Sequence, residues 1–378
     1  MSQTAQSAES RLETLQKDAA ALNLVEFWKL RMDIELPQPR NRAVPFLWKW
    51  SDIGPRLQAA SEIVPIEDCE RRALLLSNPG LGGKPYATDT LLGAFSLYNP
   101  GEEAPVHRHT PSASRFVLES DGGGFTTVEG EKCQMNRGDL VITPAGTWHD
   151  HGNDGKQPLI WVDILNVPLV ENLNATMFEF DYTESDQQSN SGEPVPKEIQ
   201  TISHPLGHSD KLYGTGGVVP LFASHARGIS EHSPMFVYPW EKTRAALDGM
   251  RGYEGDPYDG IIVEYADPAT GASVMPTMSF RSQMLRPDER TLAHRHMSST
   301  LYCVLEGSGY TEVDGERIEW GRNDVFAVPG WRWHAHANAS KSADAVLYSV
   351  TDEPVYRKLD LYREERKDAD GAVELLLN

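Results

Sequence analysis

The stretch RGDLVITPAGTWHDHGN, residues 137–153, decides the fold of this chain. It holds a short apolar and β-branched run, then a turn containing Pro144 and Gly146, and then two histidines two positions apart, His149 and His151. Short runs of this kind separated by Pro and Gly predict two strands joined by a tight turn. Because alternate side chains of a strand point to the same face, His149 and His151 are predicted to share a face.

The same pattern occurs a second time as RNDVFAVPGWRWHAHAN, residues 322–338. Upstream of each stretch lies a His-x-His pair, in APVHRHT (104–110) and in TLAHRHM (291–297). The offset between the copies is 187 residues at the first pair and 185 at the second, and eight of the twelve histidines match in this way: His107, His109, His149 and His151 with His294, His296, His334 and His336. The sequence therefore predicts an internal duplication of one β domain.

The pattern of apolar and polar residues in the remaining chain predicts the domain organisation. Apolar residues recur at three- and four-residue steps near the N-terminus, which is typical of an amphipathic helix. DYTESDQQSNSGEP (181–194) is typical of an exposed linker, and a helix is predicted from Val355 to Lys367. The predicted segments are an N-terminal helical extension at 1–70, a first β domain at 71–168, an irregular linker at 169–259, a second β domain at 260–352, and a C-terminal helix and tail at 353–378.

Composition excludes several classes of function. The chain has 378 residues, with 35 Lys and Arg against 55 Asp and Glu, so its formal net charge is −20. Such a charge argues against nucleic acid and against an anionic membrane surface, because both need a basic face. No apolar run is long enough to span a membrane, and the polar N-terminus lacks the order of a signal peptide. Three separated cysteines, Cys69, Cys133 and Cys303, predict no disulfide framework and favour the cytoplasm.

The clustered histidines predict a metal site. His107 and His109 fall on one face of a strand, and an antiparallel neighbour would place His149 beside them. Three neutral imidazoles form a metal site with open coordination positions. A single histidine in a strand is more often a packed or surface residue, but two His-x-His pairs in each copy are hard to explain in that way. A second possible site is formed by His294, His296, His334 and His336.

These residues resemble the cupin superfamily. The downstream cupin pattern is a Gly, five residues, Pro-x-Gly, two residues, a His, three residues and an Asn, and the first copy matches it throughout at Gly138, Pro144, Gly146, His149 and Asn153. In the second copy Asn323 and Trp331 replace the two glycines. The glutamate that usually follows the His-x-His pair is absent from both copies. The resemblance implies a mainly β bicupin fold of two double-stranded β-helix (jelly-roll) barrels, with helical N- and C-terminal extensions.

Longer segments resemble the bicupin ring-cleaving dioxygenases that act on gentisate, salicylate and 1-hydroxy-2-naphthoate. The segments are AVPFLWKW (43–50), RRALLLSNPGLGG (71–83), EEAPVHRHTPSASRFVLE (102–119), RGDLVITPAGTWHDHGND (137–154) and QPLIWVDILNVP (157–168). The resemblance implies an Fe(II) enzyme that opens gentisate with O2 to give maleylpyruvate, with salicylate or 1-hydroxy-2-naphthoate as alternative substrates. It also implies a homotetramer, and His107, His109 and His149 as the iron ligands.

The resemblance implies roles for other residues of the first copy. Arg71 or Arg115 would hold the substrate carboxylate, and Arg72 would point the opposite way. His151 would hydrogen-bond a ring hydroxyl or bound oxygen, and Asp163 would orient a ligand or an arginine. Leu92 and Ser96 are candidates for shaping the pocket. Arg115 could equally form a surface ion pair, and Asp163 could be a buried structural charge. In the second copy Thr300 is taken to stand in place of Arg115, which argues against an identical reaction there.

Two other classes of cupin protein predict different sequence features. A manganese or iron cupin that acts on oxalate or as an isomerase predicts a glutamate after the His-x-His pair, and the chain lacks it. A non-catalytic metal-binding bicupin, such as a seed-storage or sugar-sensing protein, would tolerate loss of the histidines, whereas both clusters are retained.

Overall fold

A computed structural model of the chain describes residues 2–180, 201–220, 222 and 231–377. Residues 1–40 form one compact unit and residues 41–378 a second. The first unit contains α1 (Ser2–Ala21) and α2 (Phe27–Ile34), which confirms the predicted helical N-terminus. The predicted linker at 181–194 lies outside the described residues.

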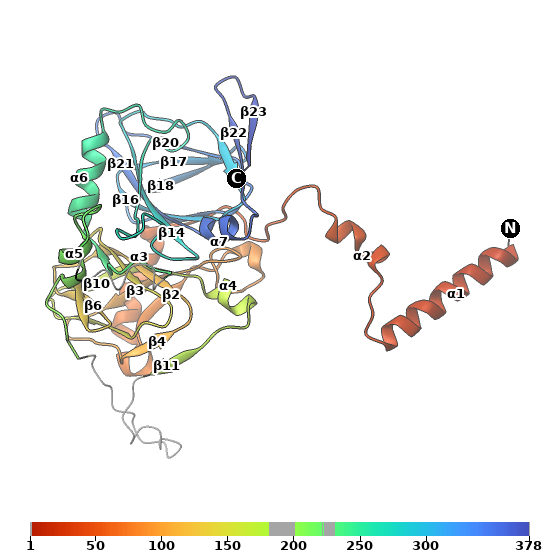
Figure 1. The fold of residues 1–378 in the computed structure, drawn as a ribbon, viewed down its shortest axis with the longest axis horizontal. Coiled ribbons are helices and arrows are strands. Elements are labelled where there is room, and N and C mark those ends of the chain that lie inside the picture. The colour runs from red at the N-terminus through yellow and green to blue at the C-terminus, as the bar shows by residue number, and fades with distance from the viewer. Residues whose placement is uncertain (1, 181–200, 221, 223–230, 378) are drawn as a thin grey trace, which may run out of the picture. The chain divides into compact units, whose positions relative to one another are not determined.

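The second unit contains two barrels of antiparallel strands (Figure 1). In the first barrel a six-stranded sheet has the order β12-β8-β5-β10-β3-β2, and a five-stranded sheet has the order β11-β4-β9-β6-β7. The strands are β2 (Arg72–Leu75), β3 (Leu92–Tyr98), β4 (His107–His109), β5 (Ala113–Glu119), β6 (Gly124–Val128), β7 (Glu131–Gln134), β8 (Leu140–Thr143), β9 (His149–Asn153), β10 (Leu159–Leu165), β11 (Phe178–Phe180) and β12 (Val237–Tyr238).

The second barrel repeats this arrangement and adds one strand, β23, at the edge of its histidine-bearing sheet. Its sheets have the orders β1-β19-β16-β21-β14-β13 and β18-β17-β20-β15-β22-β23. The strands are β1 (Phe46–Trp48), β13 (Ile261–Glu264), β14 (Ser279–Leu285), β15 (His294–His296), β16 (Thr300–Glu306), β17 (Ser308–Val313), β18 (Glu316–Gly321), β19 (Val325–Val328), β20 (His334–Asn338), β21 (Ala345–Thr351), β22 (Arg363–Lys367) and β23 (Val373–Leu377). The predicted bicupin fold and the predicted duplication are both confirmed.

Each barrel completes its larger sheet with a strand from outside its own repeat. β1 precedes the first barrel in the chain but pairs with β19 of the second, while β12 pairs with β8 of the first. The helix after each of these strands is held by an aspartate of the repeated stretch at 137–153 or 322–338. Trp50 N, at the start of α3 (Trp50–Ile63), donates to Asp324 Oδ1 at 2.7 Å. Trp240 N, at the start of α6 (Trp240–Met250), donates to Asp139 Oδ1 at 2.7 Å. A carboxylate there satisfies a main-chain donor that the helix leaves unpaired.

The larger sheets of the two barrels share one apolar core. Its buried members include Phe95 and Phe116 from the first barrel and Phe280 and Tyr348 from the second. The rings of Phe116 and Tyr348 stack with centroids 3.9 Å apart and planes inclined by 5°. The barrels are therefore fixed to each other by strand exchange and by a continuous core, and each smaller sheet carries one histidine cluster.

Two sequence-based expectations about the connecting segments were wrong. The region after Pro168 was expected to be irregular, but it contains β11, α5 (His208–Tyr213), β12 and α6, and α4 (Val167–Asn172) spans its start. The helix expected from Val355 to Lys367 is α7 (Glu353–Lys358), and the hairpin β22–β23 follows it. The α4–β11 and α7–β22 segments are equivalent parts of the two copies. The missed strands have two to five residues each, which is too few to show a clear alternation in the sequence.

The remaining predictions about the whole chain concern cysteines and membranes. Among the residues that the structure describes, Cys69, Cys133 and Cys303 form no disulfide bond. Within the described residues, no helix is both long enough and apolar enough to cross a membrane.

Candidate metal centre and active site

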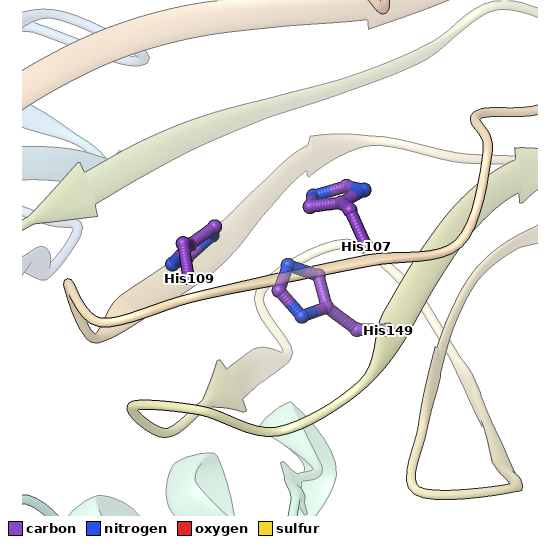
Figure 2. Close-up of side chains that lie close together, drawn as sticks. All are labelled: His107, His109 and His149. Atoms are coloured by element: carbon purple, nitrogen blue, oxygen red, sulfur yellow. The ribbon is translucent and has the colours of Figure 1, made fainter. Parts of the chain in front are cut away.

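Three buried histidines converge in the mouth of the first barrel (Figure 2). His107 and His109 lie on β4, and His149 begins β9 directly opposite His107 in the antiparallel register. One ligand nitrogen from each of the three lies within 4.8 Å of the others. The predicted placement of His149 across the ladder is confirmed.

The main chain fixes which nitrogen of each imidazole is free. Nδ1 lies 2.8 Å from Pro105 O in His107, 2.6 Å from Pro111 O in His109, and 2.9 Å from Thr147 O in His149. A carbonyl oxygen only accepts hydrogen bonds, so each Nδ1 carries the proton and each Nε2 keeps its lone pair. Nε2 of His149 is fully buried and has no hydrogen-bond partner among the described residues.

Burial keeps these imidazoles neutral. Burial lowers the pKa of His107, lowers that of His109 to about 4, and lowers that of His149 well below its usual value. Neighbouring positive groups add to the effect, and for His109 and His149 the largest such contribution comes from His107. Neutral imidazoles with inward lone pairs are what a divalent transition metal requires, so this donor set fits such an ion.

Asp163 lies between the two arginines that the sequence analysis singled out. Its carboxylate is 3.5 Å from Arg71 Nε and 3.5 Å from Arg115 Nε, and it accepts a hydrogen bond of 2.6 Å from Ser96 Oγ. Arg115 and Asp163 are almost fully buried, which excludes a surface ion pair for Arg115. Arg72 instead donates to Val64 O and pairs with Glu102, so it points away from this group as predicted.

His151 lies in the same barrel and is bound on both sides. Its Nε2 accepts from Arg115 Nη2 at 3.0 Å, which places its proton on Nδ1, 3.1 Å from Thr126 Oγ1. Arg115 Nη1 also donates to Thr143 Oγ1 at 3.0 Å. Burial lowers the pKa of His151 well below its usual value, so the ring is a neutral acceptor for the guanidinium. The structure thus brings His151, Arg115 and Asp163 together, through a hydrogen bond between His151 and Arg115 and an ion pair between Arg115 and Asp163.

Glu70 also contacts this site and was not predicted from the sequence. Its Oε1 accepts from Arg71 Nη1 at 2.7 Å and lies 3.5 Å from His107 Nε2. Burial alone raises the pKa of Glu70, but the charges of neighbouring groups, chiefly Arg71 and His107, together lower it by more. The pKa of Glu70 is therefore below its usual value, and the carboxylate is ionised. No cupin motif includes this position. The neighbouring Arg71 was the one signal in the sequence for a role of Glu70. If β2 began before Arg72, strand alternation would place the side chains of Glu70 and Arg71 on opposite faces.

Phe178 on β11 was also missed, because its segment was expected to be irregular. It pairs with His109 in the ladder, and its ring stacks on that of His107 with centroids 5.2 Å apart and planes inclined by 11°. The alternation Phe178-Glu179-Phe180 spans only three residues, which is too few to identify a strand from the sequence. Leu92 and Ser96 lie four residues apart on one face of β3. Of the two, only Ser96 has a polar contact with the site, through its hydrogen bond to Asp163. Their predicted roles in shaping a pocket stay predictions.

The residue of the second copy that is equivalent to Arg115 is Tyr302, not the predicted Thr300. Thr300 was expected to stand where the first copy has Arg115. The strand register shows instead that Arg115 pairs with Asp163 on β10 as Tyr302 pairs with Ser349 on β21. The error arose from matching positions by proximity to the histidines rather than by strand register. The second barrel therefore has Tyr302 and Ser349 where the first has its buried arginine and aspartate.

Known proteins resemble the chain over nearly its whole length. The family model of the Cupin domain matches residues 94–165 and 281–351. A 5-aminosalicylate 1,2-dioxygenase of Comamonas sp is 39% identical over 98% of this chain and 94% of its own, and a gentisate 1,2 dioxygenase of Aquipseudomonas alcaligenes is 37% identical over 91% and 93%. A salicylate 1,2-dioxygenase structure from Pseudoaminobacter salicylatoxidans, described as an adduct with gentisate, has a TM-score of 0.84 at 30% identity and covers 94% of each chain.

The fold and the histidine triad define a bicupin enzyme. More narrowly, the chain belongs to the family of ring-cleaving 1,2-dioxygenases that includes the gentisate and salicylate enzymes.

Replacing Asp163 with asparagine tests the buried charge arrangement. Asp163→Asn removes the negative charge between Arg71 and Arg115, and removing one partner of a buried pair costs about 3–5 kcal/mol. We expect the free energy of unfolding, measured by denaturant titration, to fall by about that amount. Asp154→Asn is the matched control, because Asp154 is exposed and its pair with Lys132 is worth about 0–1 kcal/mol. Equal effects of the two variants would contradict this assignment.

Proposed function

We propose that the chain is an Fe(II)-dependent dioxygenase that cleaves the ring of gentisate (2,5-dihydroxybenzoate) to maleylpyruvate. The bond broken lies between the carboxyl-bearing carbon and the neighbouring hydroxyl-bearing carbon, and both atoms of O2 enter the product. The proposed metal ligands are His107, His109 and His149, which offer the convergent set of neutral imidazoles described above.

The position of the Glu70 carboxylate carries this proposal. One oxygen contacts both the Arg71 guanidinium and the metal-facing nitrogen of His107, at 2.7 and 3.5 Å. The site therefore accommodates a carboxylate between a fixed cation and the metal position. An ortho-hydroxybenzoate places its carboxylate and hydroxyl oxygens side by side, so it can reach the metal position through both groups while Arg71 pairs with the carboxylate.

Fe(II) would supply the Lewis-acid and electron-transfer chemistry that a reaction with dioxygen needs. The chain's residues bind and orient the substrate around it. Arg71 holds the carboxylate, and Asp163 keeps Arg71 and Arg115 in place. Arg115 is held by its hydrogen bond to His151, and its fixed positive charge stabilises oxyanion charge as it develops on the substrate.

The ring substituent para to the hydroxyl separates the candidate substrates. Gentisate carries a hydroxyl there and 5-aminosalicylate an amino group, and both donate electron density to the ring that is oxidised. Salicylate carries neither group, and 1-hydroxy-2-naphthoate is larger. The 5-aminosalicylate relative matches 98% of this chain, so 5-aminosalicylate is the second candidate substrate. Leu92 and Ser96 are proposed to shape the pocket, and we expect a homotetramer.

Reconstitution with Fe(II) tests the proposed reaction. The protein is loaded with Fe2+ without oxygen and then mixed in air with gentisate, 5-aminosalicylate, salicylate or 1-hydroxy-2-naphthoate. We expect the near-ultraviolet absorbance of the ring-opened product, which is maleylpyruvate for gentisate, to grow fastest with gentisate. His149→Ala should abolish the growth, whereas His204→Ala, which alters an exposed histidine, should not. Faster turnover of another acid would overturn the choice of gentisate, and turnover by His149→Ala would overturn the site.

Replacing Glu70 with glutamine tests whether its carboxylate occupies the substrate position. Glu70→Gln removes an anion that competes with the substrate for Arg71. An exposed or half-buried pair is worth about 0.2–1 kcal/mol, so we expect KM for gentisate to fall by up to about fivefold while kcat changes little.

Glu102→Gln is the matched control, because Glu102 pairs with the neighbouring Arg72, which points away from the site. It should leave KM unchanged. A fall of kcat without a fall of KM in Glu70→Gln would show instead that Glu70 takes part in the reaction.

A further inference from the structure

The mouth of the second barrel holds a histidine triad of its own. His294 and His296 lie on β15, and His334 begins β20 opposite His294, in the register that His107 and His149 adopt. One ligand nitrogen from each lies within 4.8 Å of the others, and all three side chains are buried. The duplication has therefore preserved the geometry as well as the residue types.

The free nitrogens of this triad point to a missing ligand. His296 Nδ1 lies 2.8 Å from Ser298 O, and His334 Nδ1 lies 2.9 Å from Arg332 O, so both rings keep a lone pair on Nε2. Nε2 of His294 and Nε2 of His334 are buried without a hydrogen-bond partner among the described residues. A buried polar atom without a partner costs about 1–3 kcal/mol, which a bound cation would offset.

The turn that delivers His334 is kept although its sequence has changed. Trp331 stands at the position of Gly146 and has a φ of 61°, against 77° for the glycine. A left-handed conformation costs a non-glycine residue about 1–2 kcal/mol. The second copy therefore retains a strained backbone conformation that holds His334 in place.

The surroundings differ from those of the first site. Phe178 of β11 pairs with His109, whereas Glu364 of β22 pairs with His296. Glu364 Oε1 lies 3.7 Å from His294 Nδ1, the nitrogen whose counterpart in His107 faces a main-chain carbonyl. Tyr362 Oη donates to Glu364 at 2.9 Å and Arg366 Nε donates to it at 2.6 Å. A carboxylate behind a ligand histidine orients the ring and raises its basicity.

We propose that the second barrel binds a divalent transition-metal ion through Nε2 of His294, His296 and His334. Glu364 is the positioning residue that holds His294 through Nδ1. His294, His296 and Glu364 line a cavity of about 190 Å³ that also includes Arg281 and Asp259. The ion has a chemical environment unlike that of the first site, and its binding does not depend on the ring-cleavage reaction.

Metal content tests this proposal independently of turnover. The full chain is loaded with Fe2+ without oxygen, freed of unbound metal by gel filtration, and analysed by mass spectrometry of the metal. We expect two ions per chain in the wild type, one in His334→Ala and one in His149→Ala. The surface control His204→Ala should keep two. One ion in the wild type, or an unchanged count in His334→Ala, would overturn the second site.

Glu364→Gln provides a milder variant in case His334→Ala fails to fold. Competition with a chelator should show one ion bound about 10- to 100-fold more weakly, with the other ion unaffected. Identical affinities in wild type and Glu364→Gln would contradict the positioning role of Glu364. Loss of turnover in His149→Ala, with its second ion retained, would separate this centre from the proposed reaction.

Discussion

The hydrogen bond from Nδ1 of each ligand histidine to a main-chain carbonyl is the constraint on which the site depends. In the first barrel the carbonyls belong to residues within two positions of each histidine, so the backbone sets the orientation of its own ligands. Each Nε2 is left as an acceptor, and burial keeps it unprotonated. The metal-binding geometry is thus a property of β4, β9 and the turn before β9, and it exists before any ion binds.

Strand exchange explains how two such sites coexist in one chain. β1 and β12 each complete the barrel of the other repeat, and Asp139 and Asp324 of the repeated motif hold the helices that follow those strands. The sheets that carry the histidines take no part in this exchange, and the residues around the two histidine clusters differ. The first mouth holds Phe178 from β11, whereas the second holds acidic and basic side chains from β22, and the arginine–aspartate group of the first mouth comes from β5 and β10 of the larger sheet.

The sequence predicted what repeats or alternates and missed what depends on tertiary contact. The His-x-His pairs and the Pro-Gly turn sufficed for the barrel, the duplication and the triad. Glu70 was not predictable, because its place beside His107 follows from how the segment before β2 packs on the barrel. β11 and β22 are too short for a periodic signal, so Phe178 and Glu364 were missed. Thr300 was wrongly matched to Arg115, because strand register, which places Tyr302 there, is not visible in the sequence alone.

The most direct measurement of the central claim is a crystal structure of the Fe(II)-loaded protein, prepared and frozen without oxygen. The account predicts iron in the first barrel bound through Nε2 of His107, His109 and His149, at about 2.0–2.2 Å, with each Nδ1 still bonded to its carbonyl. Iron bound through Nδ1 of any of the three, or in a sphere that omits His149, would contradict it.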